Sequence, residues 1–478
     1  MSMTTSPDNP FFQLPLRFDP ARYYGSLAWV ELALQGITTS PPRSIELIGL
    51  PGMGKSSLLR YLADPEGAIT RNKAALQSPF RSEPSRLLMV LVEFRLLPTD
   101  AHPFVYIHDR FFAEYEGYRR MERASKTSTS PESRQITESL KPDLATVVVE
   151  DLLTELKEKG VRVAFLLDDF HLAFGRLTQI ETTRLRPWRD RAAFVISTEQ
   201  RLNKVNAEAA GSPFFQTLPV IPFGGLSQKE AGRLLSDTSS RGGWPFHPED
   251  VKFMVRQAGT HPYLLIVGGR VLWEVRNSLR VPTGKKVSVS KDHPQMLLGH
   301  YIERFASTFQ MYIDHLEEDE RLALQATISG EVEAEHYPAL AYLERLGLVE
   351  FEADGNMYRT FSPLFGEFVA DTREGQPRPI VKLQVSGVEA SLLEYLRLHS
   401  DRICTFEELS QNVWGELSSY SREGELFQPR IQVAVSRLRK KLQESAAGDI
   451  VSFRGKGYKL VTSSQIKAHL PLSDGSSG

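Results

Sequence analysis

The stretch Gly49-Leu50-Pro51-Gly52-Met53-Gly54-Lys55-Ser56 decides the fold of this chain. It fits the phosphate-loop pattern G-x-x-x-x-G-K-S/T at every fixed position. A mostly apolar run from Ile45 to Ile48 precedes it as an expected buried strand, and the segment from Ser56 to Leu62 follows it with helical spacing. Because the strand and the helix that the pattern requires are both predicted, a plain Gly/Pro-rich turn before an ordinary helix is the weaker interpretation.

The residue types of this loop suit phosphate binding. Glycines let backbone N–H groups curl around phosphate oxygens, and the start of the following helix adds the positive end of its dipole. We expect Lys55 to reach the β and γ phosphates of a nucleotide and Ser56 to ligate Mg²⁺. The loop residues expected to bind the nucleotide are Gly49, Pro51, Gly52, Gly54, Lys55, Ser56 and Ser57.

Length and composition describe an ordinary globular protein of several domains. The chain has 478 residues, more than one hydrophobic core usually serves, which suggests roughly two to four domains. Hydrophobic residues make up 41% and charged residues 24% of the chain. The net charge is −2, so any affinity for nucleic acid must come from a local basic patch.

Cysteine usage and hydropathy favour a cytoplasmic protein without a membrane partner. Cys404 is the single cysteine, which rules out an internal disulfide and is more typical of a small buried hydrophobe than of a reactive thiol. A reducing compartment fits this usage. No run approaches the roughly 18 apolar residues of a membrane helix, and the polar segment from Met1 to Pro10 lacks the regions of a signal peptide.

A second apolar run, from Val163 to Leu167, ends in the acidic pair Asp168-Asp169. A carboxylate at the tip of a strand beside the phosphate loop lies where Mg²⁺ needs a further ligand, and we assign that role to Asp168. Asp169 follows at a place where an acidic residue can orient or deprotonate the attacking water. A turn start or a helix cap is the alternative, which the upstream phosphate loop disfavours.

Further strands are predicted at Leu87 to Phe94, Ala192 to Ser197 and Thr217 to Ile221, which gives a set of five. Strands that alternate with helices specify a parallel sheet, so the expected fold class is α/β. Ser197 or Thr198, at the tip of the fourth strand, is placed to sense a γ phosphate, with a simple strand cap as the alternative. The expected catalytic residues are Lys55, Asp168, Asp169 and Thr198.

The expected nucleotide is ATP or ADP. No N-K-x-D guanine box is present, since Asn72-Lys73 is followed by Ala74-Ala75 and lies in the wrong place. Tyr23 and Tyr24 could stack on adenine, and plain hydrophobic packing is the alternative for both.

A helical region follows the sheet. It opens at a capping box, Ser227 with Glu230, and runs to about Asn277. Inside it lies Gly259-Thr260-His261-Pro262-Tyr263-Leu264-Leu265, where Pro262 is at least a first-turn helix proline.

Glu317 to Ser329 and Tyr337 to Leu346 have helical spacing, and Leu348 to Phe361 has the pattern of a hairpin that turns at Asp354-Gly355. Helices followed by a hairpin predict an internal winged helix. Its acidic helix and acidic hairpin argue against a nucleic-acid surface.

The C-terminal region combines an amphipathic basic helix with a basic hairpin. At about 100° per residue, the expected helix from Pro429 to Leu442 has an apolar stripe of Ile431, Val435, Leu438 and Leu442. The opposite face carries Arg430, Val433, Ser436, Arg437, Lys440 and Lys441. Two strands follow, Ile450 to Phe453 and Tyr458 to Val461, joined by the basic turn Arg454-Gly455-Lys456-Gly457.

Residues 10 to 370 or so resemble the STAND class of signalling ATPases, relatives of AAA+ and archaeal origin-recognition ATPases. The order of phosphate loop, acidic strand tip, polar strand tip and lid proline carries this resemblance. It implies ATP or ADP with Mg²⁺ on Ser56 and Asp168, and it makes Pro262 a contact to adenine. Two residues separate Gly259 from Pro262, where the family has one. Arg201 could contact the γ phosphate, but a solvated surface arginine is the favoured interpretation.

Residues 378 to 462 or so resemble the OmpR/PhoB-type winged-helix effector domain of bacterial response regulators. The matching pieces are Phe406-Glu407-Glu408-Leu409, Val413-Trp414-Gly415, the run from Val435 to Leu442, and Arg454-Gly455-Lys456-Gly457-Tyr458. The resemblance implies double-stranded DNA as a partner. It directs Val433, Ser436, Arg437 and Lys440 to the major groove, and Arg454 and Lys456 to the adjacent backbone or minor groove. A protein-binding winged helix with a solvated basic face is the alternative.

These inferences predict the following division of the chain: 1–42, an N-terminal tail and helix; 43–224, a phosphate-loop NTPase domain; 225–300, a helical lid; 301–372, an internal winged helix; 378–462, a DNA-binding winged helix; and 463–478, a tail. The expected function is a nucleotide-controlled, sequence-specific DNA-binding regulator in the bacterial cytosol or nucleoid, with slow ATP hydrolysis. A nucleotide-dependent homo-oligomer and a separate protein partner stay open. The alternatives are a DNA-dependent ATPase of a mobile-element or replication complex, a STAND-type defence sensor with a separate effector, and a module that holds nucleotide without hydrolysing it.

Overall fold

The computed structural model forms two compact units, residues 1–92 with 107–376 and residues 93–106 with 377–478, which are described separately. The structure describes residues 9–11, 18–125, 141–279, 281, 287–352, 357–371, 389, 392–393, 395–396, 399, 402–414, 424–444, 448–453 and 456–462. The predicted hairpin turn at Asp354-Gly355 lies outside these residues.

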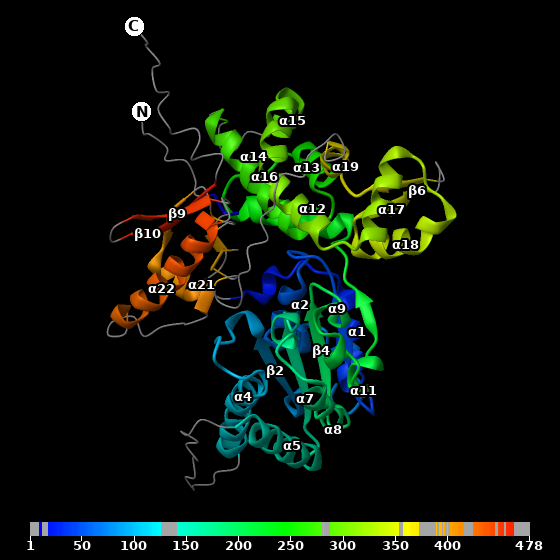
Figure 1. The fold of residues 1–478 in the computed structure, drawn as a ribbon, viewed down its shortest axis with the longest axis vertical. Coiled ribbons are helices and arrows are strands. Elements are labelled where there is room, and N and C mark those ends of the chain that lie inside the picture. Colours follow the sequence, from blue (N-terminus) through cyan, green and yellow to red (C-terminus); the bar gives the residue numbers. More distant parts are fainter. Residues whose placement is uncertain are drawn as a thin grey trace. The chain divides into compact units, whose positions relative to one another are not determined.

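The first unit is built on a five-stranded sheet (Figure 1). Its strands are β1 (Ile45–Ile48), β2 (Leu87–Glu93), β3 (Arg162–Asp168), β4 (Ala192–Thr198) and β5 (Val220–Pro222). They follow the order β2-β3-β4-β1-β5, and the pairs β3–β4, β4–β1 and β1–β5 are parallel. β4 therefore lies between the strand that enters the phosphate loop and the strand that ends in Asp168. This arrangement confirms the predicted α/β class.

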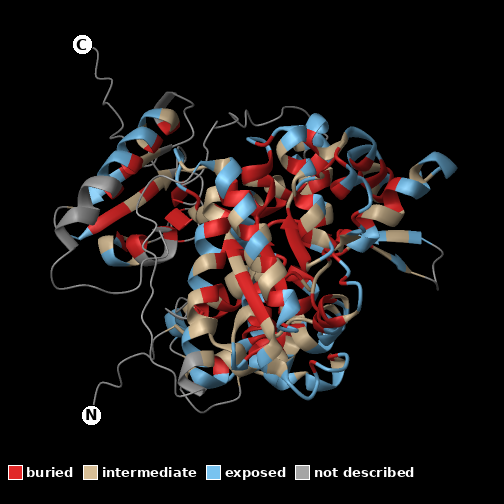
Figure 2. Cartoon of the chain, turned by 90° about the horizontal axis from the view of Figure 1, so that it is seen from below, coloured by how far each residue is buried: buried red, intermediate tan, exposed pale blue. Residues whose placement is uncertain are grey.

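Helices cover the sheet, so β3 and β4 are buried along almost their whole length, as the apolar runs predicted (Figure 2). These helices are α1 (Leu27–Thr38), α2 (Lys55–Ala63), α3 (Ala68–Arg71), α4 (Pro103–Ser125), α5 (Pro142–Glu158), α6 (His171–Phe174), α7 (Gln179–Thr183), α8 (Leu185–Arg189), α9 (Leu202–Val205), α10 (Ala207–Ala210) and α11 (Pro213–Gln216). Only β5 departs clearly from the prediction, because Thr217 still belongs to the cap of α11.

The segment predicted to be a helical lid, 225–300, contains α12 (Gln228–Arg241), α13 (Pro248–Ala258), α14 (Pro262–Ser278) and α15 (Val289–Asp292), and α16 (Pro294–Asp314) runs past its expected end. The predicted capping box is present, since Ser227 and Glu230 bond each other's backbone N–H groups. Pro262 is the first residue of α14, where its missing N–H costs nothing. The local signals thus place the helix starts correctly.

The internal winged helix contains α17 (Glu318–Ser329), α18 (Tyr337–Leu346), β6 (Val349–Glu352), β7 (Met357–Thr360) and α19 (Pro363–Asp371). β6 and β7 form an antiparallel pair. Gly330 and Gly347 end α17 and α18 with φ of 74° and 78°, the left-handed geometry that glycine adopts without a steric penalty. The helices and the hairpin occur where the sequence predicted them.

The second unit contains β8 (Cys404–Thr405), α21 (Phe406–Trp414), α22 (Gly424–Glu444), β9 (Gly448–Phe453) and β10 (Gly457–Thr462). Its sheet has the order β8-β10-β9 and is antiparallel. Cys404 is buried in the core, as expected for a small hydrophobe. α22 begins before Pro429, so this proline does not mark the helix start. Among the helices in the described part of the chain, none has the length and apolar character needed to cross a membrane.

Candidate nucleotide and nucleic-acid sites

The phosphate loop connects β1 to α2 and uses glycine where its backbone turns. Gly52 and Gly54 have φ of 78° and 100°. Lys55, the first residue of α2, is buried and its Nζ donates to the carbonyl oxygens of Gly49 at 2.6 Å and Leu50 at 3.0 Å. The ammonium group therefore lies inside the curl of its own loop, where phosphate oxygens would compete with those carbonyls.

The start of the lid helix α14 packs on this loop. A Cβ on Gly52 would lie 2.7 Å from Cβ of Tyr263, and a Cβ on Gly54 would lie 3.9 Å from Cγ of Pro262. The first distance is too short for any side chain, so glycine at position 52 lets Tyr263 approach. The predicted nucleotide residue Pro262 thus lies beside the predicted phosphate-binding loop.

The acidic tip of β3 meets the phosphate loop. Asp168 and Asp169 are both buried. The Ser56 hydroxyl donates to Oδ1 of Asp168 at 3.1 Å, and the Ser197 hydroxyl donates to the same oxygen at 2.6 Å. Asp169 has φ of 52°, a left-handed backbone that is uncommon outside glycine. The structure therefore brings together Ser56 and Asp168, the two residues predicted to hold Mg²⁺.

The two candidates at the tip of β4 separate because neighbouring residues of a strand point to opposite faces of the sheet. Ser197 joins Asp168, whereas the Thr198 hydroxyl donates to Oε1 of Glu46 on β1 at 2.8 Å. Thr198 therefore does not join Ser56 and Asp168, and its role as a phosphate sensor stays a prediction. Glu46 is buried, which raises the pKa of its carboxyl group to about 7 despite the hydrogen bond from Thr198.

Arg201 is not the solvated arginine that the sequence suggested. Its guanidinium pairs with Glu317, donates to Oε1 of Glu320 at 2.6 Å, and lies 4.3 Å above the ring of Tyr342. The Glu320 side chain is only 5% exposed. Burial raises the pKa of Glu320, and Arg201 opposes that rise. The loop after β4 is thus ion-paired with the internal winged helix.

His261, which the sequence did not single out, also contacts the internal winged helix. It is fully buried and stacks on Phe361 with ring centroids 4.0 Å apart. Burial lowers the pKa of His261 to about 4, so the imidazole is neutral near pH 7. Its Nε2 lies 2.8 Å from the carbonyl oxygen of Gly347 and donates to it. The only sequence signal was its place immediately before Pro262.

The aromatic residues near the start of the chain take the packing role that was their alternative. Tyr23 is buried and stacks on Tyr61 with centroids 4.2 Å apart. Tyr24 accepts a hydrogen bond from Arg241 of α12 at 2.6 Å. Both side chains therefore have partners within the protein.

In the second unit, α22 has the predicted apolar and polar sides. Its buried side chains include Ile431, Val435, Leu438 and Leu442. Val433, 50% exposed, shares the open face with Ser436, Arg437 and Lys440.

Lys441 was also predicted for this face. It is partly buried, and its Nζ pairs with Glu389 at 2.6 Å. Arg430 lies in α22, but its side chain is outside the described residues, as is the whole of Arg454.

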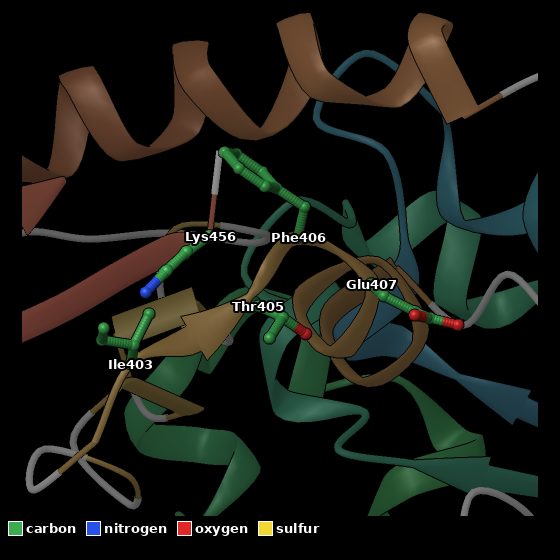
Figure 3. A pocket seen from close by; sticks show the side chains of 5 residues that line it. All are labelled: Ile403, Thr405, Phe406, Glu407 and Lys456. Carbon is green, nitrogen blue, oxygen red and sulfur yellow. The ribbon is translucent and has the colours of Figure 1, made fainter. Parts of the chain in front are cut away.

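The hairpin after α22 brings Lys456 to the surface. Gly457, with φ of 147°, could not carry a side chain, because its Cβ would lie 1.9 Å from the carbonyl oxygen of Cys404. A recess of about 440 Å³ beside this hairpin is lined by Ile403, Thr405, Phe406, Glu407 and Lys456 (Figure 3). It adds a small amphipathic surface at the start of α21.

Residues 381–460 match the family "Transcriptional regulatory protein, C terminal". The transcriptional regulatory domain thus contains α21, α22 and the basic hairpin, the elements that carry the predicted DNA-binding residues. The chain joins this domain to an α/β unit with a phosphate loop.

Solved structures with 14% identity or less are similar over most of the chain. The Walker-type ATPase PABY2304 of Pyrococcus abyssi has 14% identity and a TM-score of 0.46, covering 75% of this chain and 99% of that chain. The ADP form of Aeropyrum pernix ORC2 has 13% identity and a TM-score of 0.43, covering 77% and 99%. The ORC1 protein of the same organism in complex with DNA has 14% identity and a TM-score of 0.37, covering 76% and 96%. No curated protein matches the chain.

Proposed function

We propose that this chain is an ATP-controlled regulator that binds specific DNA sequences through its transcriptional regulatory domain. The observation that carries the proposal is the union, in one chain, of that domain with a phosphate loop whose Ser56 contacts a buried acidic strand tip. The transcriptional regulatory domain supports DNA binding as the output, and the phosphate loop supports nucleotide binding as the input.

The loop residues suit ATP or ADP with Mg²⁺. Backbone N–H groups around Gly52 and Gly54, together with Lys55, would hold the phosphates. Ser56 donates its proton to Asp168, which leaves the lone pairs of its hydroxyl oxygen for a metal ion. Oxygen ligands from serine, aspartate and phosphate are those that Mg²⁺ prefers. Mg²⁺ would neutralise charge that develops on the phosphates during hydrolysis.

Asp169 is the proposed general base. It follows the metal ligand Asp168 directly and is buried beside it, so its carboxylate could take a proton from a water aimed at the γ phosphate. Slow hydrolysis at this site would return the protein from its ATP state to its ADP state.

The proposed switch lies in the contacts between the nucleotide site and the elements that cover it. Tyr263 of the lid packs on Gly52, and Arg201 near the strand tips pairs with Glu320 of the internal winged helix. A nucleotide can control such contacts only if it binds one arrangement better than another. We infer that ATP and ADP differ in this respect through the γ phosphate, and that the difference sets the exposure or oligomeric state of the transcriptional regulatory domain.

The open face of α22 is the proposed reading surface for double-stranded DNA. Arg437 can form two hydrogen bonds with a guanine, Val433 can contact the methyl group of a thymine, and Ser436 can bond to several bases. Lys440 would face the major groove with them, Lys456 would contact phosphates, as would Arg454 from the family resemblance, and Arg430 belongs to the same predicted DNA-binding face. Lys441 contributes less in this proposal, because Glu389 already pairs with it.

The test is selection from a genomic duplex-DNA library with ATP, with ADP and without nucleotide. The wild type is compared with Lys55→Ala and Arg437→Ala. We expect a discrete motif that shifts in affinity with nucleotide, with the shift lost in Lys55→Ala and the motif lost in Arg437→Ala. Nucleotide-dependent binding without a motif would instead favour a DNA-dependent ATPase, and absence of DNA binding would refute the proposal.

A further inference from the structure

Ser197 contacts Asp168, the last residue of β3, and the two residues that follow it. Its hydroxyl donates to Oδ1 of Asp168 at 2.6 Å and accepts from the backbone N–H of Asp169 at 2.9 Å. Its carbonyl oxygen accepts from the N–H of Phe170 at 3.0 Å. Ser197 is fully buried, so water does not replace these bonds. One residue of β4 thus fixes both the side chain and the backbone of the acidic tip.

The hydroxyl of Ser197 has a single proton, and Asp168 receives it. A residue that senses a γ phosphate by hydrogen bonding must donate to a phosphate oxygen. Ser197 could do so only by releasing Asp168. The contacts therefore favour a role toward the acidic pair over direct recognition of phosphate.

The backbone of Asp169 gives an independent reason for this role. A left-handed backbone, here with φ of 52°, is uncommon for a residue with a Cβ, although aspartate adopts it more readily than most, and it is stabilised by its surroundings. The surroundings include the bond from the Asp169 N–H to Ser197 and the bond from the Leu172 N–H to the Asp169 carbonyl oxygen at 3.0 Å. Loss of the Ser197 hydroxyl removes one of these two restraints.

We propose that Ser197 is the positioning residue of the nucleotide site: it orients Asp168 toward the metal ion shared with Ser56 and holds Asp169 in its left-handed conformation. The inference rests on the proposed nucleotide function and deepens it. Ser197 acts on the metal through Asp168 and makes no contact of its own with the metal ion or the phosphates.

The experiment measures how Mg²⁺ affects the affinity of the full-length protein for a fluorescent, non-hydrolysable ATP analogue. Ser197→Ala removes the hydroxyl, and Ser197→Thr keeps it. Ser44→Ala is the matched control, because it removes a buried hydroxyl that accepts from the backbone N–H of Phe194 on β4 at 3.0 Å and lies outside the proposed nucleotide site. Affinity in EDTA shows whether each variant keeps a folded phosphate loop.

In Ser197→Ala we expect the Mg²⁺ concentration for half-maximal effect to rise about tenfold or more, the usual result of removing a group that orients a metal ligand. Affinity in EDTA should stay at the wild-type value, Ser197→Thr should restore the Mg²⁺ response, and Ser44→Ala should leave it unchanged. Hydrogen exchange of the nucleotide-free protein should rise in the peptide from Leu167 to Leu172 of Ser197→Ala alone.

A wild-type Mg²⁺ response in Ser197→Ala overturns the inference. An equal shift in Ser44→Ala also overturns it, because the effect would then be general to buried hydroxyls that contact β4. If Ser197→Ala instead loses only its preference for ATP over ADP, Ser197 is a phosphate sensor and the inference is wrong. If the nucleotide affinity of the wild-type protein does not depend on Mg²⁺, the proposed nucleotide function itself is refuted. This result can be told apart from failure of the Ser197 inference, which appears only in the variants.

Discussion

Replacing Arg201 by methionine should loosen the internal winged helix from the nucleotide site. Methionine keeps an apolar stem to pack on Tyr342 and removes the guanidinium that binds Glu317 and Glu320. Arg359 offers a matched control in the same winged helix. It also pairs with two glutamates, Glu350 and Glu352, but its side chain is 57% exposed, against 36% for Arg201.

The expected magnitude follows from the burial of the partners. The Glu320 side chain is 5% exposed, and hydrogen bonds to buried charged groups contribute about 1.5–3 kcal/mol. Glu317 is 32% exposed and adds little. We therefore expect Arg201→Met to cost about 2–3 kcal/mol. Arg359→Met removes only exposed ion pairs and should cost less than about 1 kcal/mol.

Hydrogen exchange measured by mass spectrometry can detect this difference locally. If these free-energy costs lower the stability of α17 against local opening, its amides should exchange about 30- to 150-fold faster in Arg201→Met. In Arg359→Met they should exchange less than about fivefold faster. The difference from wild type should be greater at pH 8 than at pH 5. Burial raises the pKa of Glu320 and Arg201 opposes the rise, so without Arg201 more of the cost of ionising Glu320 remains.

Equal exchange rates in the two variants would refute the reasoning, since they would mean that the ion pair to the buried Glu320 stabilises the protein no more than exposed ion pairs do. So would an unchanged rate in α17 of Arg201→Met. An effect confined to the β6–β7 hairpin would place the coupling elsewhere.

Three further predictions test other residues. Glu46→Gln should remove a pH dependence of the free energy of unfolding. Burial raises the folded pKa of Glu46 from 4.5 to about 7, so the contribution of its carboxyl group to stability is complete below pH 4.5 and is lost as pH rises through 7. The variant should gain at most about 3 kcal/mol above pH 7, measured by urea unfolding at pH 5 and 8.5, and an unchanged pH profile would contradict this. Once a DNA motif is known, replacing a contacted thymine by uracil should weaken the wild type several-fold and leave Val433→Ala unaffected in a competition assay, whereas equal losses would exclude Val433 as the methyl contact. Lys456→Ala should lower the slope of log affinity against log salt by about one in a titration from low to high salt, and an unchanged slope would show that Lys456 contacts no phosphate.

Local patterns were sufficient to predict the framework of the nucleotide site. Glycine and lysine spacing identified the phosphate loop, and a buried apolar run identified the strand that ends in Asp168. These signals work because the backbone geometry of the loop and the burial of the strand depend on adjacent residues. The amphipathic period of α22 likewise predicted which side of the helix is buried.

Contacts between distant segments could not be predicted in the same way. Arg201 and Glu317 are 116 residues apart, and His261 and Gly347 are 86 apart. No local pattern links such residues, because their meeting depends on how the lid and the winged helix pack. The different surroundings of Ser197 and Thr198 could not be predicted for a smaller reason: a strand reverses its face at every residue, so an error of one position exchanges the two environments.

The packing around the phosphate loop suggests how phosphate binding there could affect the internal winged helix. Lys55 now bonds to two carbonyl oxygens of its own loop, so a bound phosphate must exchange with those bonds. Next to it, Cε of Met53 lies 3.6 Å from the point where a Cβ of Gly347 would stand, and the Gly347 carbonyl accepts from His261. A shift of the loop by a fraction of an ångström would therefore press on the turn between α18 and β6, because closely packed interiors transmit small displacements. Under the proposed function, phosphate binding would reach the internal winged helix through Met53 and Gly347 as well as through Arg201, and a variant that breaks only one of these connections should weaken nucleotide control without abolishing it.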